Sequence, residues 1–200
     1  MNCEATAGKS CRRFSTKRSL CKEVMSTFDR DVWLLRARKK LESRATKCPS
    51  SIDALADEYA EEIDSIEMID AVVTWCTSKG IDVVFRKHHG DWYDSDKKTV
   101  EINCKASIKR QLHAMLHECG HHLIGSATNN VYANGWPKAL DHRVKRTKKH
   151  KIDVLEEEFE AWKRGEKLAR KLGLGLDVRS YNETRVKSLS TYVRWAADKK

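Results

Sequence analysis

The sequence predicts an α+β fold, because helical and strand-like periodicities occur in separate blocks along the chain. Residues 51–79 repeat apolar side chains every three or four positions, which is typical of a helix with one buried face. Residues 81–87 are β-branched and aromatic, and residues 98–103 alternate apolar with polar side chains, which is typical of strands. Helical periodicity then returns and continues to the end of the chain.

The charge composition of the first 48 residues predicts a basic extension outside the main domain. Residues 1–50 hold 13 Lys and Arg against 5 Asp and Glu, and residues 1–15 show no apolar periodicity, so we expect them to be disordered. Apolar positions at helical spacing predict a basic helix over residues 19–45. Pro49 and its neighbours interrupt that helix, so the folded domain is expected to span residues 49–200.

The remaining elements follow from turn and cap signals. Gly80 and Gly125 suit helix C-caps because glycine adopts the left-handed backbone conformation freely. Between them, the polar stretch of residues 88–96 separates strand-like segments, which predicts two or three antiparallel strands. The helices expected after the strands span residues 107–125, 152–172 and 182–198, with a loop after the first of them.

Composition narrows the class of protein. The net charge is +10, which can attract nucleic acid electrostatically, but no nucleic-acid motif accompanies it. No apolar run approaches the ~20 residues of a membrane span, and the N-terminal region lacks a secretory signal, so we expect no membrane contact. Seven cysteines without a CxxC pair argue against a disulfide framework and a cysteine zinc ribbon, and favour the cytoplasm.

One stretch carries chemistry: His117-Glu118-Cys119-Gly120-His121 matches the pattern HExxH. On a helix, positions four apart lie ~40° apart on one face, so both imidazoles can bind one Zn²⁺ ion. Glu118 adjoins the first of them and can act as the general base toward water. The spacing therefore predicts a zinc site with His117 and His121 as ligands and Glu118 as the catalytic residue.

The other side chains of this helix are expected to have structural roles. His113 lies eight residues from His121, ~12 Å along the axis, too far for the three histidines to share one ion. His122 points ~100° away from His121 and is expected to be structural or solvent-facing. Cys119 faces away from the metal and should be a small core residue, while Gly120 indicates a closely packed backbone.

The third ligand must come from elsewhere. The pattern HExxHxxGxxH is excluded, since its last histidine would fall at Ala127. Downstream, Glu156, Glu157 and Glu158 are the acidic candidates, with His142 and His150 more distant. Glu158 has apolar neighbours at i−4, i−3, i+3 and i+4, so its carboxylate points into a core, which is costly unless it is paired or bound to metal. Glu158 is therefore the preferred third ligand.

These features resemble a known family. The segments INCKASIKRQLHAMLHECGHHLIG and EEFEAWKRGEKLA are similar to the ImmA/IrrE-type minimal zincin metallopeptidases, over less than half of the chain. The resemblance implies a zincin-like domain, peptidase activity and a glutamate third ligand at Glu158. Trp162 departs from the family pattern, in which many relatives carry Asp or Asn. Helix-turn-helix domains, common in that family, are not evident in residues 1–50.

The sequence thus predicts a zinc metallopeptidase acting on a protein of unknown identity. The substrate is expected to lie extended beside an exposed edge strand formed by residues 98–103. Tyr132, His142 and His150 are candidates for stabilising the transition state. Two alternatives stay open: a nucleic-acid-binding or virion-associated protein with a structural or vestigial zinc site, and a regulator resembling an anti-repressor that binds its partner without cleaving it.

Overall fold

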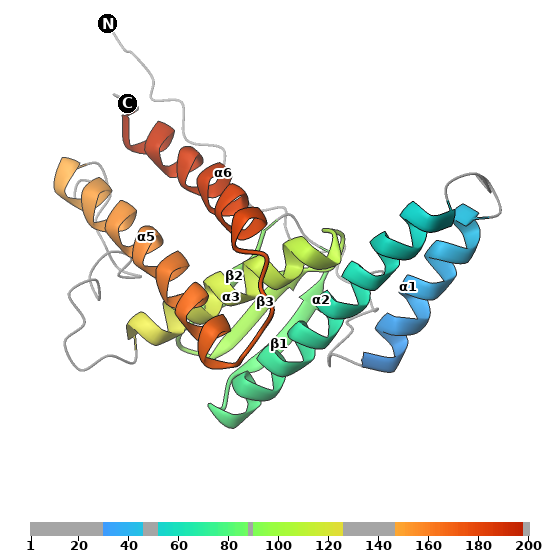
Figure 1. Ribbon diagram of the computed structural model, residues 1–200. Helices are drawn as coiled ribbons and strands as arrows, with labels where there is room; N and C mark the ends of the chain where they lie inside the picture. The colour runs from blue at the N-terminus through green and yellow to red at the C-terminus, as the bar shows by residue number, and fades with distance from the viewer. Residues whose placement is uncertain (1–29, 46–51, 88–89, 126–146, 198–200) are drawn as a thin grey trace, which may run out of the picture.

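The computed structural model describes residues 30–45, 52–87, 90–125 and 147–197, and the fold is α+β as the sequence predicts. Over these residues five helices accompany one small three-stranded sheet (Figure 1). In none of these helices is an apolar stretch long enough to cross a membrane. The elements are α1 (Arg30–Ala45), α2 (Ile52–Ser78), β1 (Asp82–Arg86), β2 (Trp92–Asp94), β3 (Thr99–Asn103), α3 (Ile108–Gly125), α5 (Lys148–Lys171) and α6 (Val178–Ala197).

The sheet differs from the expected antiparallel arrangement. Its strand order is β1-β3-β2, and β3 pairs parallel with β1 and antiparallel with β2. Residues 98–103 therefore contain the central strand, and the prediction that they form an exposed edge is wrong. β3 is central because β2, a three-residue strand within the polar stretch, forms a tight hairpin with it and occupies the edge of the sheet. Asp94 stabilises this hairpin because its carboxylate accepts hydrogen bonds from the amides of Asp96 and Lys97.

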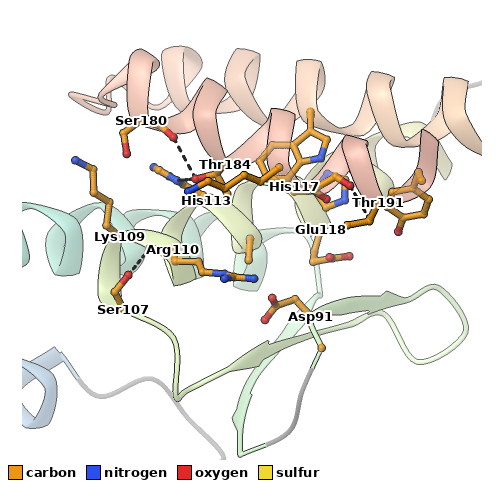
Figure 2. A pocket seen from close by; sticks show the side chains of 16 residues that line it. Asp91, Ser107, Lys109, Arg110, His113, His117, Glu118, Ser180, Thr184 and Thr191 are labelled. Atoms are coloured by element: carbon orange, nitrogen blue, oxygen red, sulfur yellow. Dashed lines mark hydrogen bonds between the residues drawn. The ribbon is translucent and has the colours of Figure 1, made fainter. Parts of the chain in front are cut away.

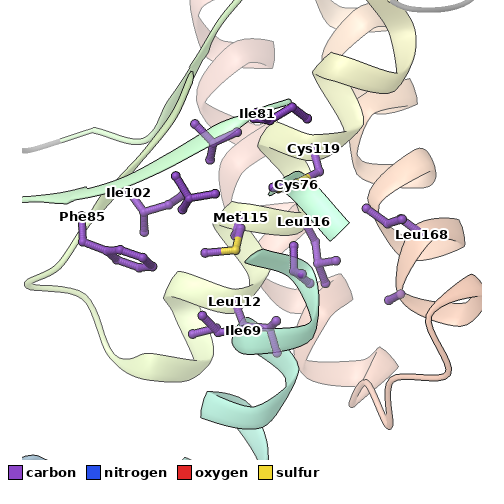
Figure 3. Packing of buried hydrophobic residues seen from close by; sticks show 14 of the residues in the cluster. Ile69, Cys76, Ile81, Phe85, Ile102, Leu112, Met115, Leu116, Cys119 and Leu168 are labelled. Atoms are coloured by element: carbon purple, nitrogen blue, oxygen red, sulfur yellow. The ribbon is translucent and has the colours of Figure 1, made fainter. Parts of the chain in front are cut away.

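The core lies between the sheet, α2 and α3. Figure 3 shows Ile69 and Cys76 of α2 close to Met115 and Cys119 of α3, with Ile102 of β3 beside them. All five side chains are fully buried, and the sulfur atoms of the two cysteines are 3.5 Å apart. The expectation that Cys119 is a small core residue is confirmed. The opposite face of α3 packs against α5.

Helices α3 and α5 approach each other at two glycines. A Cβ at Gly120 would overlap the carbonyl oxygen of Ala161, and one at Gly165 would lie 2.5 Å from the carbonyl oxygen of Leu116. The close backbone packing predicted at Gly120 is therefore confirmed. Since the backbones touch here, side chains one turn away on the two helices are brought face to face.

The C-terminal helices begin earlier than the sequence predicts. α5 begins at Lys148, where the hydroxyl of Thr147 accepts a hydrogen bond from the amide of His150. α6 begins at Val178, next to Asp177, whose carboxylate accepts from the amide of Ser180. Tyr181 then holds α6 against α5, since its buried hydroxyl donates to the carbonyl oxygen of Trp162 over 3.0 Å.

At the N-terminal side, α1 packs on α2 and reaches the sheet. Trp33 is buried, and its ring lies edge-on to that of Phe85 with the centroids 5.0 Å apart. Residues 30–45 of the expected basic helix are thus helical, while residues 19–29 and the segment expected to be disordered lie outside the described residues.

Candidate metal centre

Two histidines of α3 and one glutamate of α5 converge on a single point. The Nε2 atoms of His117 and His121 are 3.2 Å apart, as the i, i+4 spacing on one helix face allows. Oε2 of Glu158 lies 3.2 Å from Nε2 of His117, and its Oε1 lies 3.6 Å from Nε2 of His121. One ligand atom from each residue can be chosen so that all three lie within 4.8 Å of one another, so this group can hold a metal ion.

The separations fit a small tetrahedral ion. Bonds of ~2.0–2.2 Å to nitrogen and oxygen place the ligands of a tetrahedral site ~3.3–3.6 Å apart. The donor set is also incomplete as a hydrogen-bonded cluster, because the buried Oε2 of Glu158, although 3.2 Å from Nε2 of His117, makes no hydrogen bond of good geometry among the described residues. Leaving a buried carboxylate oxygen unpaired is unfavourable, and a cation at this point would satisfy it.

Glu157 supports His121 from the opposite side of its ring. Its Oε1 lies 3.3 Å from Nδ1 of His121, which orients the imidazole and directs Nε2 toward the other donor atoms. Burial alone would lower the pKa of His121, but the Glu157 contact and the charges of Glu118, Glu158 and Glu157 raise it to about 9. Of the three consecutive acids, Glu158 faces the histidine pair, Glu157 binds Nδ1 and Glu156 is exposed.

His117 is supported by a ring stack instead of a carboxylate. The indole of Trp162 lies parallel to the imidazole, with centroids 4.4 Å apart and an interplanar angle of 22°. The buried Nδ1 of His117 has no hydrogen-bond partner in the described part of the chain. Among the described residues, the stack on Trp162 is thus a contact that holds this imidazole.

Glu118 lies beside the three converging side chains and is buried, with 6% of its surface exposed. Burial raises the pKa of its carboxyl, and the charges of Glu158 and Asp91 add to this, while His117 and His121 oppose it. A carboxylate with a raised pKa accepts and returns a proton more readily near neutral pH, as a general base requires.

A cavity of about 690 Å³ opens beside His117 and Glu118. It lies between α3, the residues that precede β2, and α6 (Figure 2). Asp91 lies opposite Glu118 in this view, while Thr184 and Thr191 of α6 lie on the other side of the histidine helix. His117 and Glu118 are therefore reachable from a space large enough for a short peptide.

Tyr192 is a site residue that the sequence did not indicate. Tyr192 lines the cavity, and its hydroxyl hydrogen-bonds to Glu158. Burial raises the pKa of Tyr192, and the Glu158 charge adds to this, so the hydroxyl stays protonated as a donor. Burial also raises the pKa of Glu158, but the contacts with His117, His121 and Tyr192 outweigh it and lower that pKa. The available signal was the spacing of Thr184, Ser188 and Tyr192, which places three hydroxyls on one helix face.

Of the three candidates for stabilising the transition state, one lies in the described part of the chain, and it does not line the cavity. Tyr132 and His142 lie outside the described residues. His150 is buried in the first turn of α5 near the ring of Trp195, with centroids 6.3 Å apart, and does not belong to the described lining of the cavity. Its position two turns before Glu158, ~12 Å along the helix, explains why it does not reach the cavity.

The two remaining histidines of α3 have the structural roles expected. His113 is buried, its Nδ1 lies 2.9 Å from the hydroxyl of Thr184, and its ring is edge-on to that of Tyr181. His122 is half-buried, with Nδ1 2.8 Å from the hydroxyl of Tyr93. Neither is part of the donor group formed by His117, His121 and Glu158.

Comparison with known proteins gives no family for this chain. No protein-family model, no curated protein and no solved structure matches it. The chemistry of the site must therefore be inferred from the residues themselves.

Proposed function

We propose that this protein is a zinc-dependent metallopeptidase that hydrolyses peptide bonds of a protein substrate. The observation that carries the proposal is the convergence of His117, His121 and Glu158 next to a cavity that Glu118 also lines. The order of elements, with a sheet, an HExxH helix and then a helix bearing a glutamate, is that expected of a zincin-like fold with a glutamate third ligand.

The donor atoms favour zinc over harder cations. Two imidazole nitrogens and one carboxylate oxygen are a common ligand set of catalytic zinc, whereas calcium and magnesium prefer oxygen ligands throughout. Structural zinc sites are closed by four protein ligands. Among the described residues the group has three, and the adjoining space is an open cavity. This argues for a catalytic site over a structural one.

The zinc ion would be held by His117, His121 and Glu158, and when bound it supplies Lewis acidity and lowers the pKa of water. Glu118 accepts a proton from the attacking water, whose oxygen bonds to the carbonyl carbon of the scissile peptide. Glu118 then delivers that proton to the leaving nitrogen as the C–N bond breaks, and the second proton of the water also passes to the amine, so that the products are a carboxylate and an ammonium group. Glu157 and Trp162 keep the two imidazoles in place during these steps.

Tyr192 is the residue best placed to stabilise the developing oxyanion. Among the described residues that line the cavity, one is a tyrosine, Tyr192. Its protonated hydroxyl lies next to Glu158, a proposed zinc ligand. Preorganised hydroxyl donors of this kind stabilise negative charge as it forms. Tyr192 thus takes the role for which the sequence suggested Tyr132, His142 and His150.

The substrate backbone is expected along β2, in place of residues 98–103. β2 is an edge strand in the described sheet, and Gly90 and Asp91 immediately before it line the cavity. Edge strands pair readily with an extended peptide, main chain to main chain. The side chain of Asp91 fixes this segment, because its Oδ1 accepts a hydrogen bond of 2.6 Å from the amide of Asn103.

The test is the Glu118→Gln variant of the full chain. We expect about one zinc per chain in both wild type and variant by elemental analysis, with peptide hydrolysis lost only in the variant. The His117→Ala variant should lose both zinc and activity. Because Glu118→Gln should retain its substrate, capture of bound proteins on this variant would identify what is cut.

Glu156→Gln is the matched control, since Glu156 is the exposed acid beside the proposed site and should be neutral. Hydrolysis that survives in Glu118→Gln would disprove the role of the base. If the Glu158→Ala variant kept its full zinc content, Glu158 would not be the third zinc ligand. Salt-sensitive nucleic-acid binding without any proteolysis would favour the binding alternatives.

A further inference from the structure

The cavity beside the proposed zinc site is electrostatically asymmetric. Glu118 lies at the end where the histidines converge, while Lys109, Arg110 and Lys187 line the cavity elsewhere. Arg110 and His117 are seven residues apart on α3, which places them ~10 Å apart along the axis and within ~20° of the same face. In Figure 2, Arg110 extends from α3 on the side of Asp91.

We propose that this cavity selects a peptide with an acidic side chain about three residues from the scissile bond, recognised by Arg110, while Lys187 adds positive charge to the same cavity; an extended strand covers ~10 Å in three residues. This inference rests on the proposed peptidase function and adds a substrate class to it.

Arg110 and Lys187 are the basic groups whose charge is available. Lys109 is already paired, with its Nζ 3.0 Å from Asp177 and 3.8 Å from Glu61. Within the described residues neither Arg110 nor Lys187 forms an ion pair, and both side chains are exposed. An incoming carboxylate would therefore form new charge-assisted hydrogen bonds without displacing an existing partner.

The wall opposite α3 suits a polar ligand. α6 presents hydroxyls to the cavity at helical spacing, and hydroxyls both donate and accept hydrogen bonds. These residues are Ser180, Thr184, Ser188 and Thr191. The polar part of the lining exceeds the apolar part, to which Ala114 and Trp162 contribute. A peptide main chain with a carboxylate side chain would find hydrogen-bonding partners along this wall.

Peptide is favoured over nucleic acid by the remaining charges. Asp91 and Glu118 line the same cavity, so a phosphate backbone with a charge on every nucleotide would meet carboxylates as well as bases. A single acidic side chain carries one negative charge in place of one on every nucleotide, so these two acids repel it less. The cavity therefore suits a peptide with one local negative charge.

The experiment uses the zinc-loaded full chain and matched fluorogenic peptides that carry Glu, Gln or Lys at each position up to three residues from the cleaved bond. We expect kcat/KM about tenfold higher for Glu than for Lys at one outer position, the change of a single charged contact. Arg110→Glu and Lys187→Glu should each reduce or reverse that preference. Arg110→Gln, which removes charge without adding an acid, should reduce the preference less than Arg110→Glu does.

Arg179→Glu is the matched control, because Arg179 is on α6 with 90% of its side chain exposed, pairs with Glu183 and is not part of the described cavity lining. It should keep the preference for Glu. Cleavage of all three peptides at equal rates would overturn the inference and leave the peptidase function standing.

If wild type cleaves no peptide, the proposed function fails, and affinity for the same peptides then decides the inference. The Glu118→Gln protein should bind the Glu peptide more tightly than the Lys peptide, and Arg110→Glu should remove the difference. Equal affinities, or displacement of the peptide by single-stranded RNA, would overturn it.

Discussion

Replacing Gly165 by alanine tests whether the crossing of α3 and α5 determines both stability and the proposed metal site. The new Cβ would lie 2.5 Å from the carbonyl oxygen of Leu116 and 2.6 Å from the hydroxyl of Tyr181. Ordinary contacts begin near 3.4 Å, so α3 and α5 must separate by roughly 0.9 Å, and the Tyr181 hydroxyl must also move, which breaks its 3.0 Å hydrogen bond to Trp162.

The cost can be estimated from these contacts. Overpacking costs ~1–3 kcal/mol and the lost hydrogen bond ~1 kcal/mol, while replacing glycine within a helix returns ~1 kcal/mol. We expect Gly165→Ala to lower the free energy of unfolding by about 2 kcal/mol, measured by urea denaturation with zinc present. Separation of the helices should also move Glu158 away from the histidine pair and weaken zinc binding in a chelator competition.

Gly175→Ala is the matched control, because a Cβ at Gly175 would meet no atom within 4 Å and its backbone does not adopt a positive φ. It should unfold within ~0.5 kcal/mol of wild type. If Gly165→Ala matched wild type in both urea midpoint and zinc affinity, the close crossing would not be what holds the site together.

Two further predictions concern histidines of α3. Glu157→Gln should weaken zinc binding by about 10–100-fold, because it removes the carboxylate that orients His121; unchanged affinity in a chelator competition would contradict this role. His113 makes stability pH-dependent, since burial and Lys109 lower its pKa from 6.5 to about 4 in the folded state, with Asp177 opposing. Between these values the unfolded chain binds the proton and the folded chain does not, so stability falls with pH below ~6.5, by about 2 kcal/mol at pH 5. His113→Gln should lose this component, seen as a smaller difference in unfolding free energy between pH 7 and pH 5 than in wild type, and equal differences would refute it.

Local signals in the sequence were enough to predict most of the helices and the core face of α3. The i, i+4 spacing of His117 and His121 determines that they share a face, and the apolar neighbours of Glu158 indicate that it points inward. Gly120 indicated a close backbone contact for the same local reason. The early starts of α5 and α6 were also readable, since Thr147 and Asp177 are good N-cap residues.

Long-range contacts could not be predicted in this way. The parallel pairing of β1 with β3 depends on a three-residue strand, too short to show a periodicity, whose hairpin places β3 in the centre. Tyr192 reaches Glu158 from a separate helix 34 positions later, and no spacing rule connects the two. The stack of Trp162 on His117 likewise depends on how α5 crosses α3.

That crossing explains why the proposed site and the fold depend on each other. α5 supplies Glu158 and also both supports of the histidines, Glu157 and Trp162, all within six consecutive positions. A shift of α5 along α3 would therefore disturb one ligand and the orientation of the two others together. The glycine contacts leave little room for such a shift, because the backbone of α5 already touches that of α3 at Ala161 and at Gly165. Rigid support of this kind is what a catalytic metal site requires, since small displacements of its ligands cost activity.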